Sequence, residues 1–292
     1  MKFKYLSIFL LGASLTGLTA CNDYLDVEPP SDLTPAAFFT TADDLAAYTI
    51  NLYNNTFTYI APGSYGISTF ANDNHTDNQA AMGYNTRWVP GEWKVGSNNY
   101  WTKGNWGNIR SINYFFEQVL PKYEAGKISG GSAVEHYIGE AYVIRAMHYF
   151  KFLQNIGDCP IVTNSLTDIE EELIAASERQ PRHKVARFII EDLNKAIGLL
   201  QESGPGGKNR VTKDVAYLLK SRVALYEATW EKYHAGTAFV PGGPGWPGKD
   251  AQGYNAQAEI DYFLTEAMSA AKVVGDKLVG NLAENTGTKE GM

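Results

Sequence analysis

The sequence has little of the chemistry that marks an enzyme or a nucleic-acid-binding protein. Its five histidines are scattered without the paired spacing of a zinc protease, and no Gly-x-Ser-x-Gly nucleophile turn occurs. Acidic residues outnumber basic ones by 32 to 25, so the net charge is −7 and a nucleic-acid partner is not expected. No spacing of carboxylates singles out a catalytic pair. We therefore expect a protein that is not an enzyme.

Two short motifs resemble known sites without completing them. The segment Gly243–Lys249 fits the letters of a phosphate-binding loop, but Asp250 stands where Ser or Thr should bind magnesium. Pro244 and Pro247 also remove amide donors that a phosphate cradle needs. Residues 73–77 resemble the start of a calcium loop but lack the later glycine and glutamate. We expect no cofactor, and calcium is an alternative without support.

The N-terminal residues follow the pattern of an exported lipoprotein. Lys2 and Lys4 give a positive start, and the apolar run over 6–18 is shorter than the about 20 residues that a membrane-spanning helix needs. Cys21 then directly follows Leu-Thr-Ala, as in a bacterial lipobox. We predict a lipoprotein signal peptide over residues 1–20 and anchoring acyl chains, palmitate among them, on Cys21. An ordinary signal peptide with a chance cysteine, or a membrane helix, are the alternatives.

Cysteine is otherwise nearly absent, because Cys159 is the one further cysteine in the chain. If Cys21 carries lipid, Cys159 has no disulfide partner, and burial of apolar side chains must hold the fold together. Such a lone cysteine is more often a small buried residue than a nucleophile. A mature chain of about 270 residues is long enough to bury a sizeable core.

The spacing of apolar residues predicts a mostly all-α domain over residues 41–292, after an extended tether over 21–40. Apolar side chains recur every three or four residues in each predicted helix, as Val185, Ile189 and Leu193 do. Pro121 and Gly157 are expected to end two of the helices. The predicted helices cover residues 41–54, 105–120, 134–156, 182–201, 212–233 and 256–278.

Residues 55–100 have no sustained helical period and are rich in Asn, Gly, Thr, Tyr and Trp. A long irregular stretch inside a compact domain usually carries function. Four of the six tryptophans lie between Trp88 and Trp106. We assign Trp101 and Trp106 to the core. Trp246 lies in a Gly/Pro-rich loop over 236–253, where we expect it to be exposed, at a partner surface.

Two helices share an internal echo. Arg145-x-x-x-Tyr149 in one matches Arg222-x-x-x-Tyr226 in another, and an alanine follows each arginine within two residues. Small residues where paired helices cross suggest tetratricopeptide-like helix hairpins, although the spacing exceeds that of a regular repeat. Glu140 is interpreted as a structural partner of the nearby Arg145 and not as a catalyst.

Several blocks of the chain occur in the order found in one protein family. They resemble the signatures of SusD/RagB outer-membrane nutrient-binding lipoproteins of Bacteroidetes, with Ile144 and Cys159 in place of the usual leucine and valine. The match extends over nearly all of residues 21–230. The blocks are Cys21–Asp26, Trp106–Phe115, Gly139–Phe150 followed by Gly157–Ile161, Ile190–Ala196 and Thr212–Tyr226.

The resemblance implies a fold, a location and a partner. The scaffold would be tetratricopeptide-like helix pairs with irregular loops carrying the ligand site. The protein would be a cell-surface carbohydrate-binding lipoprotein of polysaccharide utilization and nutrient uptake, anchored in the outer membrane through Cys21 and facing outward. It would cover a SusC-like TonB-dependent transporter. Family members are usually much longer, so the resemblance implies an N-terminal portion that lacks the C-terminal half of the binding site.

The resemblance also implies where a glycan would bind, although it does not say which glycan. Part of the family's aromatic surface lies in the irregular region before the helix that begins near Trp106. Here this region contains Arg87, Trp88, Trp93, Asn98 and Asn99. Exposed rings would stack on sugar faces while Asn and Arg bind hydroxyls. Burial of Trp88 or Trp93 in the core is an alternative, as is a docking scaffold or peptide-binding lid that binds no sugar.

Overall fold

The computed structural model describes residues 38–54, 56–57, 101–207, 209–249 and 251–280. The chain divides into two units, Met1–Phe39 and Thr40–Met292, and every helix described below belongs to the second. The signal peptide over 1–20, the tether up to residue 37 and most of the irregular stretch over 55–100 lie outside the described residues.

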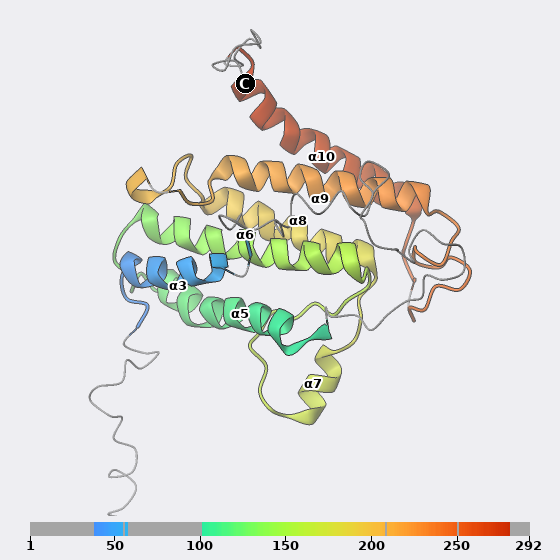
Figure 1. Ribbon diagram of the computed structural model, residues 1–292, viewed down its shortest axis with the longest axis horizontal. Helices are drawn as coiled ribbons and strands as arrows, with labels where there is room; N and C mark the ends of the chain where they lie inside the picture. Colours follow the sequence, from blue (N-terminus) through green and yellow to red (C-terminus); the bar gives the residue numbers. More distant parts are fainter. Residues whose placement is uncertain (1–37, 55, 58–100, 208, 250, 281–292) are drawn as a thin grey trace, which may run out of the picture. The chain divides into compact units, whose positions relative to one another are not determined.

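The second unit is all-α in its described part, as the sequence predicts. Successive long helices run antiparallel and stack on one another as tetratricopeptide-like hairpins (Figure 1). No β-strand occurs among these residues, and two isolated bridges join Thr41 to Ser129 and Cys159 to Gln180. The helices are α3 (Ala42–Asn54), α5 (Lys103–Glu124), α6 (Ser132–Asn155), α7 (Glu170–Ala176), α8 (Arg182–Leu199), α9 (Lys213–Tyr233) and α10 (Ala256–Leu278), with a short 3₁₀ turn at Pro205–Gly207.

Helix α3 begins with a capping box. The Asp44 amide donates to Thr41 Oγ1 at 3.2 Å, while the Asp44 carboxylate accepts from the Thr41 and Thr40 amides at 2.9 Å each. At the other end of the fold, Asn255 caps α10 by accepting a hydrogen bond from the Ala258 amide at 3.0 Å. These local side-chain contacts explain why the predicted starts of both helices agree with the structure to within one residue.

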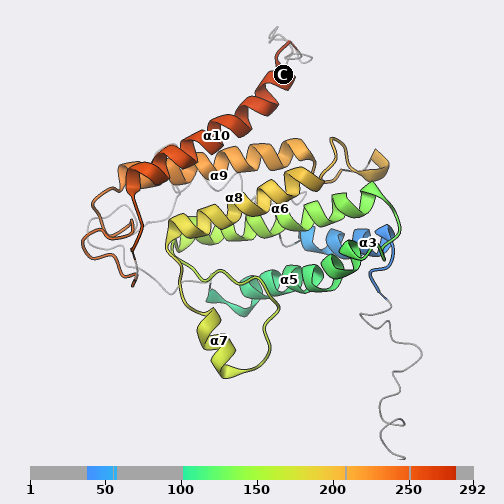
Figure 2. The ribbon, with the colours of Figure 1, turned by 180° about the vertical axis from the view of Figure 1, so that it is seen from behind.

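Helix α6 is the centre of the core. Its residues are apolar on almost every face, and it packs against α3, α5 and α8, as expected for a helix buried all round. Gly139 allows one of these approaches, because a Cβ there would lie 2.9 Å from the Leu200 Cγ. On the far side, α8 packs against α9, and α9 packs against α10 (Figure 2).

Buried ion pairs join the stacked helices. Arg145 of α6 binds Asp192 of α8 through two hydrogen bonds of 2.7 and 2.8 Å. Arg182 of α8 binds Glu227 of α9 in the same bidentate way, at 2.9 Å for each bond. Both carboxylates are fully buried. Each pair therefore fixes one helix against the next along the stack.

The predicted pairing of Glu140 with Arg145 is wrong. These residues are five positions apart on one helix, whereas neighbours on a helix face are three or four apart. The Glu140 carboxylate instead binds Arg210, with Nη1 2.7 Å from Oε2. The motifs that contain Arg145 and Arg222 match in sequence but not in environment, because Arg145 is buried and Arg222 is exposed.

One helix extends beyond its predicted end, and one helix is missing from the prediction. Pro121 does not end α5, which continues to Glu124 because the Pro121 carbonyl still accepts from the Ala125 amide at 3.2 Å. A proline near a helix end removes its own amide bond without stopping the last turn. Helix α7 is absent from the prediction because its seven residues bury no side chain and show no apolar period.

Replacing Arg145 with Met should lower the free energy of unfolding by about 3–5 kcal/mol, because Asp192 and Asn113 then lie buried without their partner. Urea denaturation followed by circular dichroism measures this. The double variant Arg145→Met/Asp192→Leu should lose less than the single one. Arg222→Met is the matched control and should stay within about 0.5 kcal/mol of wild type. Equal losses for Arg145→Met and Arg222→Met would contradict the role of the pair.

Candidate functional site

The glycan-contact residues that the resemblance implies are outside the described part of the chain. Arg87, Trp88, Trp93, Asn98 and Asn99 all fall in the segment 58–100, so their predicted role stays a prediction. The same holds for Cys21 and for the calcium-like segment 73–77. Trp101 is the first described residue after this segment.

Trp101 begins an exposed aromatic surface at the start of α5. Its side chain is 40% exposed and stacks on Trp106, with ring centroids 6.1 Å apart and planes inclined by 15°. The guanidinium of Arg179 lies 5.0 Å from the Trp101 ring centroid, a cation–π contact. Trp106 is half-buried and packs on Phe152 at 4.8 Å. We call Trp101, Trp106 and Arg179 the Trp101 ledge.

The assignment of Trp101 to the core is therefore wrong, and that of Trp106 is right only for one side of its ring. Trp101 lies two residues before α5 and has no place on the buried face of that helix. Trp106 is inside the helix and shares the face of Ile109 and Asn113, which are buried. The position of Trp101 relative to the helix start was the signal that could have identified it.

Beside the ledge, residues of α5 and α6 hold the segment 162–165 through hydrogen bonds. Asn113 of α5 donates from Nδ2 to the Val162 carbonyl at 2.9 Å and to the Asn164 carbonyl at 3.0 Å. Its Oδ1 accepts from Arg145 Nη1 at 2.9 Å, which fixes the orientation of the amide. The Tyr149 hydroxyl accepts from the Val162 amide at 2.8 Å. Asn113 thus connects the ion pair between α6 and α8 to the segment 162–165.

A second network joins α3 to the core through Arg210, which precedes α9. Arg210 Nη1 donates to Thr49 Oγ1 at 3.0 Å as well as to Glu140, and its Nη2 donates to the Ala46 carbonyl at 3.2 Å. The arginine therefore binds α3 and α6 at the same time. Tyr53 of α3 strengthens the contact, because its hydroxyl accepts from the Val211 amide at 3.0 Å.

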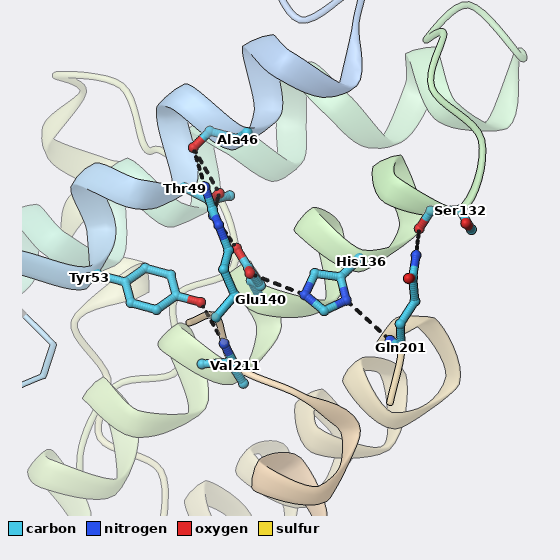
Figure 3. Close-up of polar contacts among 9 residues, drawn as sticks. Ala46, Thr49, Tyr53, Ser132, His136, Glu140, Gln201 and Val211 are labelled. Atoms are coloured by element: carbon cyan, nitrogen blue, oxygen red, sulfur yellow. Dashed lines mark hydrogen bonds and ion pairs between the residues drawn. The ribbon is translucent and has the colours of Figure 1, made fainter. Parts of the chain in front are cut away.

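The same network fixes the proton on a buried histidine (Figure 3). The Gln201 amide donates to His136 Nδ1 at 3.2 Å, so the neutral ring carries its proton on Nε2. This Nε2 lies 3.3 Å from Glu140 Oε1, and neither atom has another partner. His136 and Glu140 thus lie in contact inside the core without a hydrogen bond between these two atoms, and the full burial of both side chains gives the pair a structural place.

The Gly/Pro-rich loop is attached to the helices by Trp246. Its indole Nε1 donates to Asp158 Oδ2 at 2.9 Å, while Oδ1 of the same carboxylate accepts from the Arg182 amide at the start of α8. A Cβ on Gly248 would overlap the Trp246 ring. Trp246 is half-buried, so its expected place at an exposed partner surface is wrong. The loop follows α9 and not a strand, which excludes the phosphate-binding interpretation of Gly243–Lys249.

The Cys159 thiol and the Glu231 carboxylate are both buried inside the fold. Cys159 is fully buried, as predicted, and burial raises the pKa of its thiol to about 12. Glu231 is also fully buried, one turn after Glu227, whose partner is Arg182. Burial, and then the charge of Glu227, raise the pKa of Glu231 to about 8, although a hydrogen bond from the Tyr254 hydroxyl opposes the shift. Among the described residues no three His, Cys, Asp or Glu side chains are placed to hold a metal ion.

The comparison with protein families decides the relationship. A family model described as "Starch-binding associating with outer membrane" matches residues 23–225, more than half of the chain. The chain belongs to this SusD-like family. The matched span contains the Trp101 ledge, the Asn113 network and all helices up to most of α9.

Two curated SusD-like relatives are similar to this chain at low identity. SusD-like protein P38 of Formosa agariphila is 24% identical over 207 residues, which are 67% of this chain and 37% of the relative. A SusD-like protein of Bacteroides ovatus is 25% identical over 235 residues, covering 79% of this chain and 40% of the relative. A solved SusD-like protein of Bacteroides fragilis matches with 25% identity and a TM-score of 0.49, covering 70% and 39%. The aligned part of this SusD-like chain thus spans about two fifths of its relatives' length.

Within the described residues of the SusD-like chain, no helix combines the length and the apolar character needed to cross a membrane.

The stability of the SusD-like chain should fall between pH 5 and pH 9 through Glu231. In the unfolded chain the Glu231 carboxyl loses its proton near pH 4.5, whereas in the folded chain it keeps the proton up to about pH 8. The folded state binds more protons across this window, so the free energy of unfolding falls as the pH rises. Glu231→Gln removes the effect and should gain at least about 1 kcal/mol relative to wild type between pH 5 and pH 9, measured by urea denaturation. Glu171→Gln, at an exposed site on α7, is the control, and a constant difference between Glu231→Gln and wild type would contradict the assignment.

Proposed function

We propose that this SusD-like chain belongs to a cell-surface lipoprotein that captures oligo- or polysaccharide and delivers it to a SusC-like TonB-dependent transporter. The observation that carries this proposal is the family match over residues 23–225, whose description combines starch binding with association with the outer membrane. In this proposal Cys21 anchors the protein in the outer leaflet, and the helical unit presents the ligand site outward.

The Trp101 ledge supports carbohydrate as the ligand. Sugars offer a flat face of C–H groups that packs on an aromatic ring and an edge of hydroxyls that binds polar groups. Trp101 provides a partly exposed ring that Trp106 and Arg179 hold in place, and Arg179 adds hydrogen-bond donors. The ledge directly follows the segment with Trp88, Trp93, Asn98 and Asn99. In the proposal, these residues and the ledge all contact the glycan.

Binding without catalysis is part of the proposal. Glu227 and Glu231, one turn apart on α9, are both fully buried, where Arg182 binds the first and the Tyr254 hydroxyl donates to the second. The thiol of Cys159 is buried as well. These contacts give the groups structural roles and support a protein that holds a glycan and leaves its bonds intact.

Affinity electrophoresis against a polysaccharide panel tests the glycan. The wild-type protein should be retarded in gels that contain its ligand. Trp101→Ala should weaken retention about twofold to tenfold, because an aromatic stacking contact contributes about 0.5–1.5 kcal/mol. Trp88→Ala and Trp93→Ala should also weaken it, while Tyr233→Ala, an exposed aromatic on α9, should not. Co-purification with a barrel protein but no retardation by any glycan would favour the docking-scaffold or peptide-binding alternative.

Cys21 can be tested independently of the ligand. Cells grown with labelled palmitate should incorporate the label into the wild-type protein and into Cys159→Ala, the matched control with the other cysteine removed. Cys21→Ala should carry no label and leave the membrane fraction, because the acyl chains provide the anchor. Protease added to whole cells should degrade the wild-type protein. Complete protection from the protease would contradict the outward-facing location.

A further inference from the structure

A groove lies between α5 and the segment that leads to α7. Its volume is about 480 Å³, within the usual range of small-molecule sites. In both ribbon views α7 projects from the helix stack near the start of α5 (Figures 1 and 2). Residues 164–168, which lead to α7, line the groove on the side opposite α5. Apolar side chains of both walls line it, among them Trp106 and Ile109 from α5, Leu166 from the connecting segment and Leu173 from α7. We call this the α5–α7 groove.

Leu166 is held in a conformation that a leucine rarely adopts. Its φ is 49°, in the left-handed region, where the Cβ of a bulky residue is crowded by the backbone. Two carboxylates hold the residues on either side of it. Glu117 of α5 accepts from the Ser165 amide at 2.7 Å and from its hydroxyl at 2.6 Å. Glu172 of α7 accepts from the amide of Thr167 at 3.2 Å and from its hydroxyl.

This arrangement keeps an apolar side chain in the groove at the cost of backbone strain at Leu166. A glycine at position 166 would adopt the same backbone without strain, and a polar residue would interact with solvent at the groove surface. Strained non-glycine residues that their neighbours hold in place gather at ligand sites. Arg110 fixes the segment further, because its Nε donates to the Ser165 carbonyl at 2.9 Å.

Polar groups lie beside the mainly apolar lining of the groove, which distinguishes it from a site for an acyl chain or an apolar helix face. An acyl chain or an apolar helix face would match a groove that is apolar throughout, whereas this one also presents Lys103, Arg110, Asn164, Thr167 and Asp168. These groups offer both donors and acceptors beside apolar side chains. A sugar has the same division, with C–H faces and hydroxyl edges. Trp106 is common to the groove and the Trp101 ledge, so a chain bound at the ledge can continue into the groove.

We propose that the α5–α7 groove is a second carbohydrate subsite, in which the apolar face of a sugar unit lies on Leu166 and Leu173 and its hydroxyls bind Arg110 and Asp168. The proposal rests on the carbohydrate-binding function proposed above and extends it from the ledge to a longer ligand. The protein then binds a short oligosaccharide at the ledge alone and gains affinity for a longer one through the groove.

Two variants separate a ligand contact from a structural role. Leu166→Gly removes the side chain and suits the left-handed backbone, so the thermal unfolding midpoint should stay the same or rise. Leu173→Ala removes a side chain that is 38% exposed. Ile174→Ala is the matched control, because Ile174 is the next residue on α7, is 65% exposed and does not line the groove.

The probes are pairs of short and long oligosaccharides, maltose with maltoheptaose and laminaribiose with laminariheptaose, titrated calorimetrically into the full chain. We expect Leu166→Gly and Leu173→Ala to weaken binding of the longer member about fivefold to tenfold and to leave the shorter member unchanged. Ile174→Ala should bind both as wild type does.

The outcomes separate this inference from the function on which it rests. If both groove variants bind every length like wild type while Trp101→Ala loses affinity, the subsite is wrong and the carbohydrate-binding function stands. A loss that is the same for short and long sugars would also overturn the subsite. If the wild-type protein binds neither pair nor any glycan of the electrophoresis panel, the proposed function fails and the subsite with it.

Discussion

Most of the described fold depends on the hydrogen bonds of the buried Arg145 guanidinium. It joins α6 to α8 through Asp192 and holds Asn113 of α5 at the same time, so three helices meet at one cation. The ring of Phe116 covers it at 4.6 Å, which keeps water away from a charge that costs free energy to bury. Because Asn113 then binds the carbonyls of Val162 and Asn164, one wall of the α5–α7 groove is set by a contact deep in the core.

Several buried ion pairs lie along the stack of helices, and each of them joins two different elements. Arg145, Arg182 and Arg210 each bind a fully buried carboxylate on a different element. Replacing such pairs with apolar residues often costs little stability, whereas breaking one is expensive. Antiparallel helices with apolar faces can slide past one another, and a charge left without its partner penalises every wrong register. We interpret these pairs as determinants of register between successive helices.

The sequence predicts the helices well and their contacts poorly. Apolar periodicity and capping residues are local, so the six long helices appear within a few residues of their predicted bounds. The partners of Arg145 and Glu140 are 47 and 70 residues away, and no local pattern encodes such contacts. Helix α7 is too short to show a period, and Trp101 is exposed because it precedes its helix. The groove depends on Leu166, whose strained backbone leaves no mark in the sequence. The residues implied for ligand contact lie in the segment 58–100, outside the described part.

The attachment of α3 has a mechanical consequence. In the proposed anchoring through Cys21, any pull from the membrane reaches the described residues at the start of α3, where the backbone of residues 40–42 forms two hydrogen bonds with Ser129, of 2.8 and 2.9 Å. Further along α3, Arg210 binds the Ala46 carbonyl and Thr49 and connects them to Glu140 in the central helix α6. Force along the tether is therefore shared by a short backbone bridge and a buried cation before it can peel α3 from the core.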